Sequence, residues 1–255
     1  MSRRGPEKRM TAVPTPAADA LKGRVILITG AHGGLGEASA KACAAAGASV
    51  VLLGRKVPKL NRTYDAVKKL GPEPAMYPLD MAGAHPADFE TMADKIAAEL
   101  GGLHGVLHCA VEFKGLAPLE TIEPDDFVKQ LHVGLTAQWL LTQACMPQLK
   151  KHDSAVVFIG DELRRVSKAY WGAYGIAKAG LLGLMTMLHD ETETGPVRVS
   201  MLQPGPMRTS IRSRAFIEEA ATQCPSPEKY APACVHLLSE AGREYRGQVF
   251  APRVS

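Results

Sequence analysis

The sequence alternates between short apolar runs and longer stretches with helical patterning. The apolar runs are rich in Val, Ile and Leu, as buried parallel strands are, and they occupy residues 24–29, 49–54, 74–80, 103–110, 155–160, 197–203 and 246–251. The stretches between them predict helices at residues 34–48, 57–71, 85–102, 124–150 and 171–193. Strands that are each followed by a helix indicate one α/β domain over residues 21–255, with a doubly wound parallel sheet of about seven strands.

Two segments fall outside this alternation. The first, residues 1–20, begins MSRRGPEKRM, and these ten residues hold four of the 30 basic and one of the 26 acidic residues of the chain. The remaining 26 basic and 25 acidic residues nearly cancel, which argues against a nucleic-acid-binding surface on the folded part. We therefore expect residues 1–20 to be a disordered basic tail. The second segment, residues 205–232, is expected to form a mobile helical flap over the site.

Composition limits the class of protein. The chain is 46% hydrophobic and 22% charged, which is typical of a globular domain. No apolar run reaches the roughly 18–20 residues of a membrane-spanning helix, and no apolar segment follows the basic start as in a secretory signal. The five cysteines are scattered without CxxC spacing, so we expect neither a disulfide framework nor a metal site. A cytoplasmic protein without membrane or nucleic-acid partners is the expectation.

The stretch TGAHGGLG, residues 29–36, follows a predicted strand and opens a predicted helix. Glycines here would let the backbone turn tightly and approach a pyrophosphate, and the helix N-terminus would offer the pyrophosphate free N–H groups. A plain loop is the alternative, but the strand–turn–helix context favours a dinucleotide. The residues expected to contact the dinucleotide are Gly30, His32, Gly34, Leu35 and Gly36.

The end of the second predicted strand bears on the type of cofactor. An NAD site usually places an acidic residue there to bind the ribose 2′-hydroxyl. This chain instead has LLGRK, with Arg55, and a guanidinium suits a 2′-phosphate. NADP(H) is therefore favoured over NAD(H), with a solvated surface arginine as the alternative. Asp80, after the third predicted strand, would either accept a hydrogen bond from the adenine amino group or cap the next helix.

The stretch WGAYGIAK, residues 171–178, places Tyr174 and Lys178 four positions apart on one helix face. A tyrosine pKa of about 10 is too high for acid–base work at neutral pH. The ammonium of Lys178 would favour the phenolate and lower that pKa, and it could also hold the nicotinamide ribose. Such pairs often lie on helix surfaces by chance, but the position after the fifth predicted strand favours catalysis.

Taken in order, these motifs resemble those of the short-chain dehydrogenase/reductase family over about residues 21–251. TGAHGGLG is similar to the family's TGxxxGxG, Tyr174 and Lys178 match its YxxxK, and PGPMRT resembles its PGxxxT stretch. The resemblance implies a homodimer or homotetramer packed through the two long helices, and a small-molecule substrate. It also implies contacts with the nicotinamide from Pro204, Gly205 and Thr209, the last through the carboxamide.

Three positions depart from the family pattern. Cys109 stands in place of the asparagine of the family's NAG, and we expect it to fill space near the nicotinamide. His132 replaces an asparagine that supports a proton-relay water, and an imidazole can itself relay protons. Asp161 replaces the serine that donates to the substrate carbonyl, and an ionised carboxylate can only accept. Burial could keep Asp161 protonated, or Asp161 could bind a basic substrate or pair with Lys178 or His132.

Two functions therefore compete. The first is an NADP(H)-dependent oxidoreductase that transfers hydride to or from a small carbonyl or alcohol substrate, with Tyr174 as the acid–base residue. The alternative is a nucleotide-binding protein with impaired catalysis, acting as a sensor or scaffold, because Asp161 and His132 interrupt the expected catalytic set. A dehydration or isomerisation on the same frame is a third reading, and the sequence names no substrate.

Overall fold

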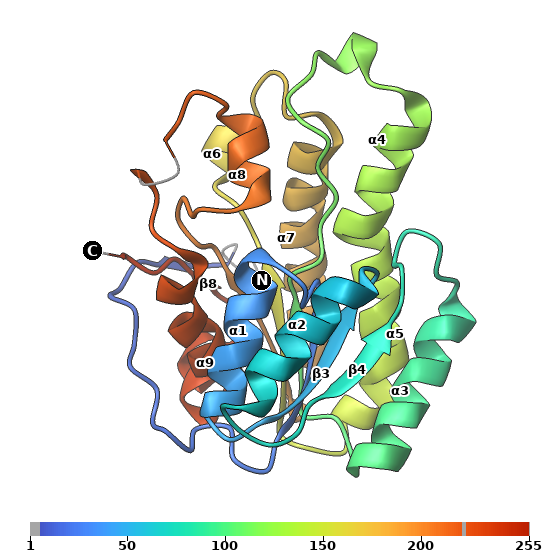
Figure 1. Ribbon diagram of the computed structural model, residues 1–255, viewed down its shortest axis with the longest axis vertical. Helices are drawn as coiled ribbons and strands as arrows, with labels where there is room; N and C mark the ends of the chain where they lie inside the picture. Colours follow the sequence, from blue (N-terminus) through green and yellow to red (C-terminus); the bar gives the residue numbers. More distant parts are fainter. Residues whose placement is uncertain (1–5, 221–222, 255) are drawn as a thin grey trace.

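Parallel strands form one sheet at the centre of the protein (Figure 1). The structure is a computed structural model that describes residues 6–220 and 223–254. Within them the sheet has eight strands: β1 (Lys8–Arg9), β2 (Val25–Thr29), β3 (Ser49–Gly54), β4 (Ala75–Pro78), β5 (Gly105–His108), β6 (Ser154–Ile159), β7 (Val197–Leu202) and β8 (Val249–Phe250). Their order is β1-β8-β7-β6-β5-β2-β3-β4, so the winding reverses between β2 and β5. The predicted doubly wound α/β fold is confirmed, with one strand more than expected.

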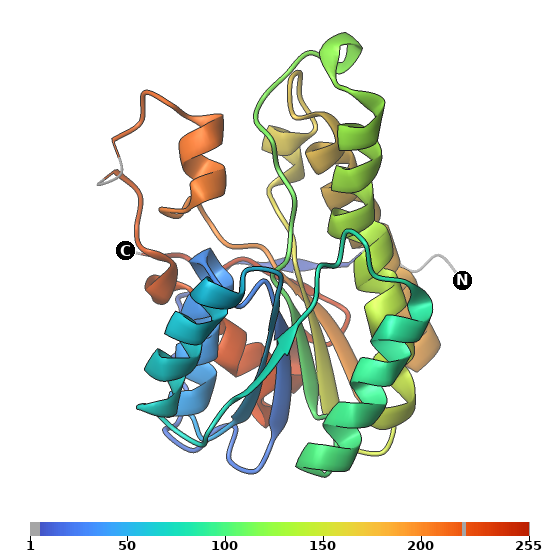
Figure 2. The ribbon, with the colours of Figure 1, turned by 45° about the vertical axis from the view of Figure 1, so that its right-hand side comes forward.

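Helices cover both faces of the sheet, because successive strand side chains point to opposite sides. In β2, Ile26 and Ile28 join the core on one face, whereas Val25 and Leu27 join the core on the other. Figure 2 separates the two layers. The first layer contains α1 (Gly34–Ala45), α2 (Val57–Lys68) and α9 (Ala231–Leu238); the second contains α3 (Pro86–Leu100), α5 (Ala137–Leu149) and α7 (Gly172–Thr192). Within the described ranges no helix combines the length and the apolar character needed to cross a membrane.

The helix predicted over residues 124–150 is interrupted. It consists of α4 (Pro124–Leu131), a π-helical turn at His132–Thr136, and α5. A π turn shifts the backbone hydrogen bonds by one residue, which leaves carbonyl groups to be satisfied by other donors. Gln138 Nε2 donates to one of them, the carbonyl oxygen of Gly134, at 3.1 Å, and also to the carbonyl oxygen of Ala110, in the loop after β5, at 3.2 Å. The wider turn is thereby tied to the loop that follows β5.

The expectation of a disordered basic tail is wrong for residues 8–12. Lys8 and Arg9 form β1 beside β8, and Ala12 makes a parallel bridge to Arg253. The edge of β8 would otherwise present unpaired N–H and C=O groups, and the tail satisfies them. The charge of Lys8 is also used, since its Nζ lies 2.6 Å from Glu162 Oε2 near the carboxyl end of β6. Residues 1–5 of the predicted tail lie outside the described residues.

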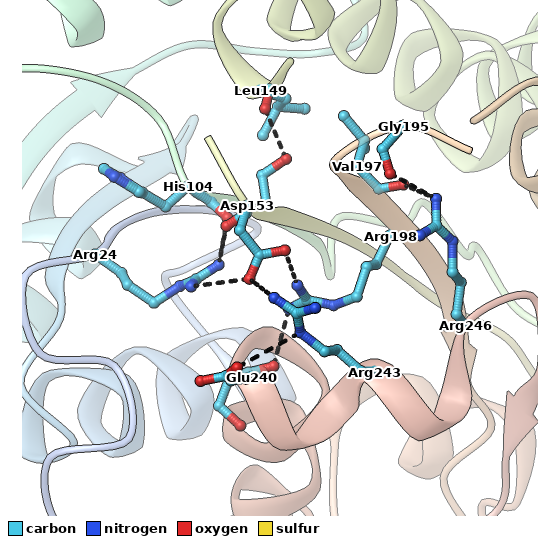
Figure 3. A network of polar contacts seen from close by, with 12 residues as sticks. Arg24, His104, Leu149, Asp153, Gly195, Val197, Arg198, Glu240, Arg243 and Arg246 are labelled. Atoms are coloured by element: carbon cyan, nitrogen blue, oxygen red, sulfur yellow. Dashed lines mark hydrogen bonds and ion pairs between the residues drawn. The ribbon is translucent and has the colours of Figure 1, made fainter. Parts of the chain in front are cut away.

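At the other end of the strands, Asp153 lies among three arginines (Figure 3). Its Oδ1 accepts from Arg198 Nη1 at 2.5 Å, its Oδ2 accepts from Arg243 Nη2 at 3.0 Å, and its backbone carbonyl accepts from Arg24 Nη2 at 2.6 Å. Burial by itself would raise the pKa of Asp153, but the charges of Arg198 and Arg243 hold that pKa below its ordinary value. The carboxylate thus joins the starts of β6 and β7 to the segment before β8.

Replacing Asp153 with asparagine should lower the free energy of unfolding by about 1–2 kcal/mol at neutral pH. The Arg198 side chain is only 4% exposed and would lose its counter-charge, but partial exposure of Asp153 keeps the loss below that of a fully buried pair. Because the pKa of Asp153 is lowered by folding, this stabilisation should disappear as the pH falls and the carboxylate is protonated. Urea unfolding at several pH values measures the difference, with Asp94→Asn on the exposed face of α3 as the control.

Candidate active site

The carboxyl ends of β2 and β5 lie side by side where the winding reverses, the position at which doubly wound sheets bind ligands. A cleft of about 370 Å³ opens there. The residues predicted from the sequence that line it are Gly30, His32, Gly34, Leu35, Arg55, Asp80, Cys109, Asp161, Tyr174, Lys178, Pro204, Gly205 and Thr209. Gly36 and His132 are not among the lining residues. Most of the predicted site is therefore gathered in one place.

The glycine loop between β2 and α1 has the close backbone approaches that its sequence predicts. Gly30 has a φ of +63°, and a Cβ there would lie 3.0 Å from the backbone nitrogen of Ala110. A Cβ on Gly36 would overlap the carbonyl oxygen of Gly30, so Gly36 acts by packing and not by lining the cleft. Since α1 begins at Gly34, its first N–H groups lie at the cleft wall.

Basic residues gather at the cleft's β3 end. Arg55, Lys56 and Lys59 line it together with His32, whose Nδ1 is buried without a hydrogen-bond partner among the described residues. The imidazole fits against Gly54, where any Cβ would overlap it. Burial lowers the pKa of His32, and the positive charges of its three neighbours lower that pKa further. This end of the cleft is suited to an anionic group.

Two acidic residues contact Arg55 in this structure. Arg55 Nη2 donates to Glu112 Oε2 at 3.1 Å, and Nη1 lies 3.8 Å from Asp80 Oδ2. Asp80 also accepts from the backbone N–H of Ala82 at 3.1 Å, within a turn. Asp80 does not cap the next helix, because His85 occupies the N-cap of α3, so that alternative is wrong. Its contact with adenine stays a prediction.

Tyr174 and Lys178 lie on α7, and both side chains are buried in the cleft wall. Tyr174 Oη donates to Asp161 Oδ2 at 2.7 Å, whereas Lys178 Nζ donates to the carbonyl oxygen of Ile159 at 2.6 Å. Burial, followed by the charge of Asp161 and its hydrogen bond, raises the pKa of Tyr174 well above its usual value. In this structure the pKa of Tyr174 is therefore raised and not lowered. The expected stabilisation of the phenolate by Lys178 when cofactor is bound stays a prediction.

The side chain of Lys178 is almost completely buried. Burial lowers its pKa from the ordinary value, and the charge of Asp161 acts in the opposite direction. Its Nζ lies 5.6 Å from the centroid of the Tyr174 ring, close enough for a cation–π contact. Cys109 lies nearby on the cleft wall, and burial raises the pKa of its thiol well above the ordinary value, so the thiol is a neutral filler of space.

Both carboxylate oxygens of Asp161 accept hydrogen bonds. Besides Tyr174 on Oδ2, its Oδ1 accepts from the backbone N–H of Glu162 at 2.7 Å and from Arg165 Nη2. In residues 6–220 and 223–254, no hydrogen bond or ion pair joins Asp161 to His132 or Lys178, so the expected pairings with those residues are wrong. His132 lies at the start of the π turn, where its backbone carbonyl accepts from Ala137. A proton-relay role for His132 stays a prediction.

Two further residues of the cleft, Arg165 and Trp171, are not among the site residues predicted from the sequence. Arg165, at the end of the short α6 (Leu163–Val166), lies in the cleft with its guanidinium over Trp171, and Cζ is 5.3 Å from the ring centroid. Phe113 stacks on the same ring at 5.8 Å between centroids, and Phe216 approaches it at 6.2 Å. The spacing of Asp161 and Arg165 at i and i+4 was the available signal.

The segment after β7 closes one side of the cleft. Pro204, Gly205 and Thr209 line it, and Tyr230 fills the space beside Gly205. Thr209 is the N-cap of α8 (Ser210–Ala215), and its Oγ1 accepts from the backbone N–H of Arg212 at 3.3 Å. Contact of Thr209 with a carboxamide stays a prediction, as does the mobility of residues 205–232.

Known proteins are similar to this chain in sequence and in structure. The family model of short chain dehydrogenases matches residues 24–220. The uncharacterized oxidoreductase YciK of Escherichia coli (strain K12) is 32% identical over 237 residues, which cover 92% of this chain and 94% of YciK. A short chain dehydrogenase from Salmonella enterica serovar Typhi has a similar structure, with a TM-score of 0.89 and 33% identity over 93% of this chain and 99% of that chain.

A second similar structure was solved with a cofactor. It is a protein from Escherichia coli CFT073, named as a short chain dehydrogenase and complexed with NADPH. It shares 33% identity and a TM-score of 0.88 with this protein, over 92% of this chain and 99% of that chain. With the glycine loop, the paired tyrosine and lysine, and the order of the strands, these matches place the chain plainly: it belongs to the short-chain dehydrogenase/reductase family.

Proposed function

We propose that the protein is an NADP(H)-dependent oxidoreductase that reduces a small carbonyl compound or oxidises the corresponding alcohol. The observation that carries this proposal is the position of the Tyr174 hydroxyl and the Lys178 ammonium in the wall of a cleft that also contains the glycine loop. Proton donor and dinucleotide loop thus face the same space, as a hydride transfer coupled to a proton transfer requires.

The residues of the cleft fit an NADP molecule. The Cβ that Gly30 lacks would collide with the backbone of Ala110, so the loop leaves its backbone free to approach a pyrophosphate at the start of α1. At the far end, the cations Arg55, Lys56 and Lys59 offer charge and hydrogen bonds to a 2′-phosphate. The NADPH complex of the similar Escherichia coli CFT073 protein supports the same assignment.

Two residues of this chain, Tyr174 and Lys178, would handle the proton that the reaction transfers to the substrate oxygen. Bound NADPH would supply the hydride that reaches the carbonyl carbon. Tyr174 holds, on Oη, the proton that completes the hydroxyl group on the substrate oxygen. Lys178, with Nζ beside the tyrosine ring, stabilises the phenolate left after that transfer, and the phenolate takes the proton back in alcohol oxidation.

A screen of NADPH oxidation with aldehydes, ketones and quinones tests this function, with cofactor binding measured in parallel. Turnover that disappears in a Tyr174→Phe variant supports it. Tight NADPH binding without turnover, unchanged by that substitution, would favour the second candidate, a nucleotide-binding protein with impaired catalysis. One observation supports this candidate: the Tyr174 hydroxyl already donates to Asp161. In that case Asp161→Ser should create turnover that the wild-type protein lacks.

Arg55→Ala should raise the Kd for NADPH about tenfold or more while leaving the Kd for NADH almost unchanged, because a charge-assisted hydrogen bond is worth about 1.5–3 kcal/mol. Arg55 lines the cleft end that suits the 2′-phosphate, and NADH lacks that phosphate. Isothermal titration with both cofactors measures the ratio. Arg62→Ala, on the exposed face of α2, is the matched control; equal losses for NADPH and NADH would contradict the assignment.

The association state belongs to this proposal as well. Apolar side chains are exposed on α4, α5 and α7, the helices through which a homodimer or homotetramer is expected to pack. They are Val128, Trp139, Ile176 and Met187, each between 45% and 64% exposed. A small-molecule substrate and a cytoplasmic location complete the expectation.

A further inference from the structure

In carbonyl reduction at this site, a second hydrogen-bond donor beside Tyr174 would stabilise the substrate oxygen, and Asp161 does not supply one. As hydride adds to the carbonyl carbon, the π electron pair moves onto the oxygen, and donors aimed at that oxygen stabilise the charge. Tyr174 offers one O–H. Asp161 stands where the serine of the family would offer another, but both of its oxygens already accept, one from Tyr174 and one from Arg165.

Arg165 is positioned at this point by two contacts. Its Nη2 donates to Asp161 Oδ1, and its guanidinium lies over the ring of Trp171. The side chain is 33% exposed, while that of Asp161 is 11% exposed, so the arginine lies on the open side of the pair. A guanidinium has five N–H donors in one plane, and the bond to Asp161 leaves others available at the cleft wall.

We propose that Arg165 is the second hydrogen-bond donor to the substrate carbonyl oxygen, and that Asp161 is the positioning residue that anchors it. The proposal rests on the oxidoreductase function and names a further catalytic residue for it. It also explains how a carboxylate can lie near a substrate oxygen that becomes negatively charged. The charges of Asp161 and Arg165 offset each other, so the oxygen faces no net negative charge.

The other three arginines of the cleft have different partners, and Arg55 contacts Glu112 and Asp80. Arg214 Nη1 donates to the backbone carbonyl of Phe113 at 2.6 Å. Arg212 makes two bonds to Glu219, at 2.5 and 2.6 Å, which hold α8 to the segment after it. Of the four arginines that line the cleft, Arg165 is the one that contacts Asp161, the residue to which Tyr174 donates. A substrate oxygen within reach of Tyr174 Oη is therefore close to Arg165.

Atoms and charges balance in the resulting step. The substrate carbon gains the hydride that NADPH gives up, and its oxygen gains the proton of Tyr174. Arg165 keeps all of its protons, because a guanidinium is not deprotonated in proteins, and it acts only while the oxygen carries charge. Arg165 thus stabilises the transition state and does not replace Tyr174 as the acid.

Arg165→Met should lower kcat about 10²–10³-fold, the loss seen when one oxyanion donor is removed, while the Kd for NADPH stays within about twofold. Arg165→Lys keeps the positive charge but lacks the planar guanidinium, so its kcat should lie between those of the wild-type protein and Arg165→Met. In an Asp161→Ser background the serine hydroxyl supplies a donor, so Arg165→Met should cost much less there. Steady-state reduction of para-nitrobenzaldehyde and phenanthrenequinone measures this cycle, with Arg164→Met, an exposed neighbour, as the control.

Two further measurements separate this proposal from the proposed function. Because the charge of Arg165 lowers the pKa of Tyr174, Arg165→Met should also move the rise of alcohol oxidation to higher pH, which a merely structural residue would not do. A crystal structure with NADPH and phenanthrenequinone should place an Arg165 N–H within hydrogen-bond distance of the quinone oxygen. No turnover by the wild-type protein would reject the oxidoreductase; an equal loss in both backgrounds, or a quinone oxygen bound without Arg165, would reject this role.

Discussion

Tyr174→Phe should lower kcat for NADPH-dependent carbonyl reduction by about 10²–10⁴-fold, the usual contribution of a positioned general acid. The substitution removes only the hydroxyl group that donates to Asp161. The aromatic packing remains, since the ring lies 5.2 Å from Phe113 and 5.6 Å from Trp171 between centroids. Cofactor affinity and thermal stability should therefore change little. Steady-state kinetics, NADPH titration and a thermal melt on the same preparation measure the three quantities.

The pH dependence of the wild-type protein tests the same assignment. Burial and Asp161 raise the pKa of Tyr174 well above 10, so the phenol stays protonated as the pH rises toward that value. Reduction, which uses the protonated phenol, should then be nearly independent of pH from about 6 to 9. Alcohol oxidation needs the phenolate and should increase only at the alkaline end. Asp161→Asn removes a negative charge, so oxidation should begin to increase at lower pH.

A matched control uses a tyrosine outside the cleft. Tyr170 is 56% exposed and lies four residues before Tyr174 in sequence. Tyr170→Phe should leave kcat and the pH profile unchanged. If Tyr174→Phe instead reduced carbonyl compounds at the wild-type rate, Tyr174 would not be the acid, whatever the identity of the substrate.

Local sequence patterns were sufficient to predict the frame of this protein. The residues of β2 are all buried, so its apolar run could be recognised as a strand of a parallel sheet. β7 is equally buried, although Arg198 and Ser200 interrupt its apolar residues. The roles of the glycines in residues 29–36 follow from short-range geometry, because Gly36 packs on Gly30 within one turn. Tyr174 and Lys178 lie one helical turn apart, so their shared face was readable as well.

Contacts between distant residues were not readable in this way. The tail pairs with β8, and Lys8 reaches Glu162 across 154 positions of sequence. Gln138 Nε2, which bonds to the Gly134 carbonyl of the π turn, also bonds to the Ala110 carbonyl in the loop after β5. From local sequence alone these segments are predicted to be a basic tail and one long helix. The residues that they contact lie far away along the chain.

The direction of the Tyr174 pKa shift also depends on contacts that local sequence does not reveal. In the sequence, Lys178 is the charged residue one helical turn from Tyr174, and its ammonium would lower the pKa of the phenol. The fold instead buries the phenol and brings Asp161, thirteen residues away, onto its hydroxyl, and both effects raise the pKa. The sign of the shift was therefore decided by tertiary packing. The same packing places Asp161 and Arg165 in the cleft, where they form an ion pair; their spacing of four residues does not by itself show this location.

Gly36→Val should weaken NADPH binding by about 100-fold, which corresponds to about 3 kcal/mol, the upper end of the usual cost of overpacking. Even one Cβ at this position overlaps the carbonyl oxygen of Gly30, and valine adds two methyl groups beyond it. The first turn of α1 would have to move away from the loop whose N–H groups face the cleft. Fluorescence titration with NADPH measures the loss, and circular dichroism checks that the fold is retained.

The control for Gly36→Val is a glycine with open space around it. A Cβ on Gly83, in the exposed turn after β4, would have no atom within 4 Å, so Gly83→Val should bind NADPH like the wild-type protein. If Gly36→Val destabilises the protein, a melting temperature that NADPH raises less than in the wild-type protein would still report the lost affinity. Wild-type affinity in a folded Gly36→Val protein would mean that the close packing of α1 on the loop is not what forms the dinucleotide site.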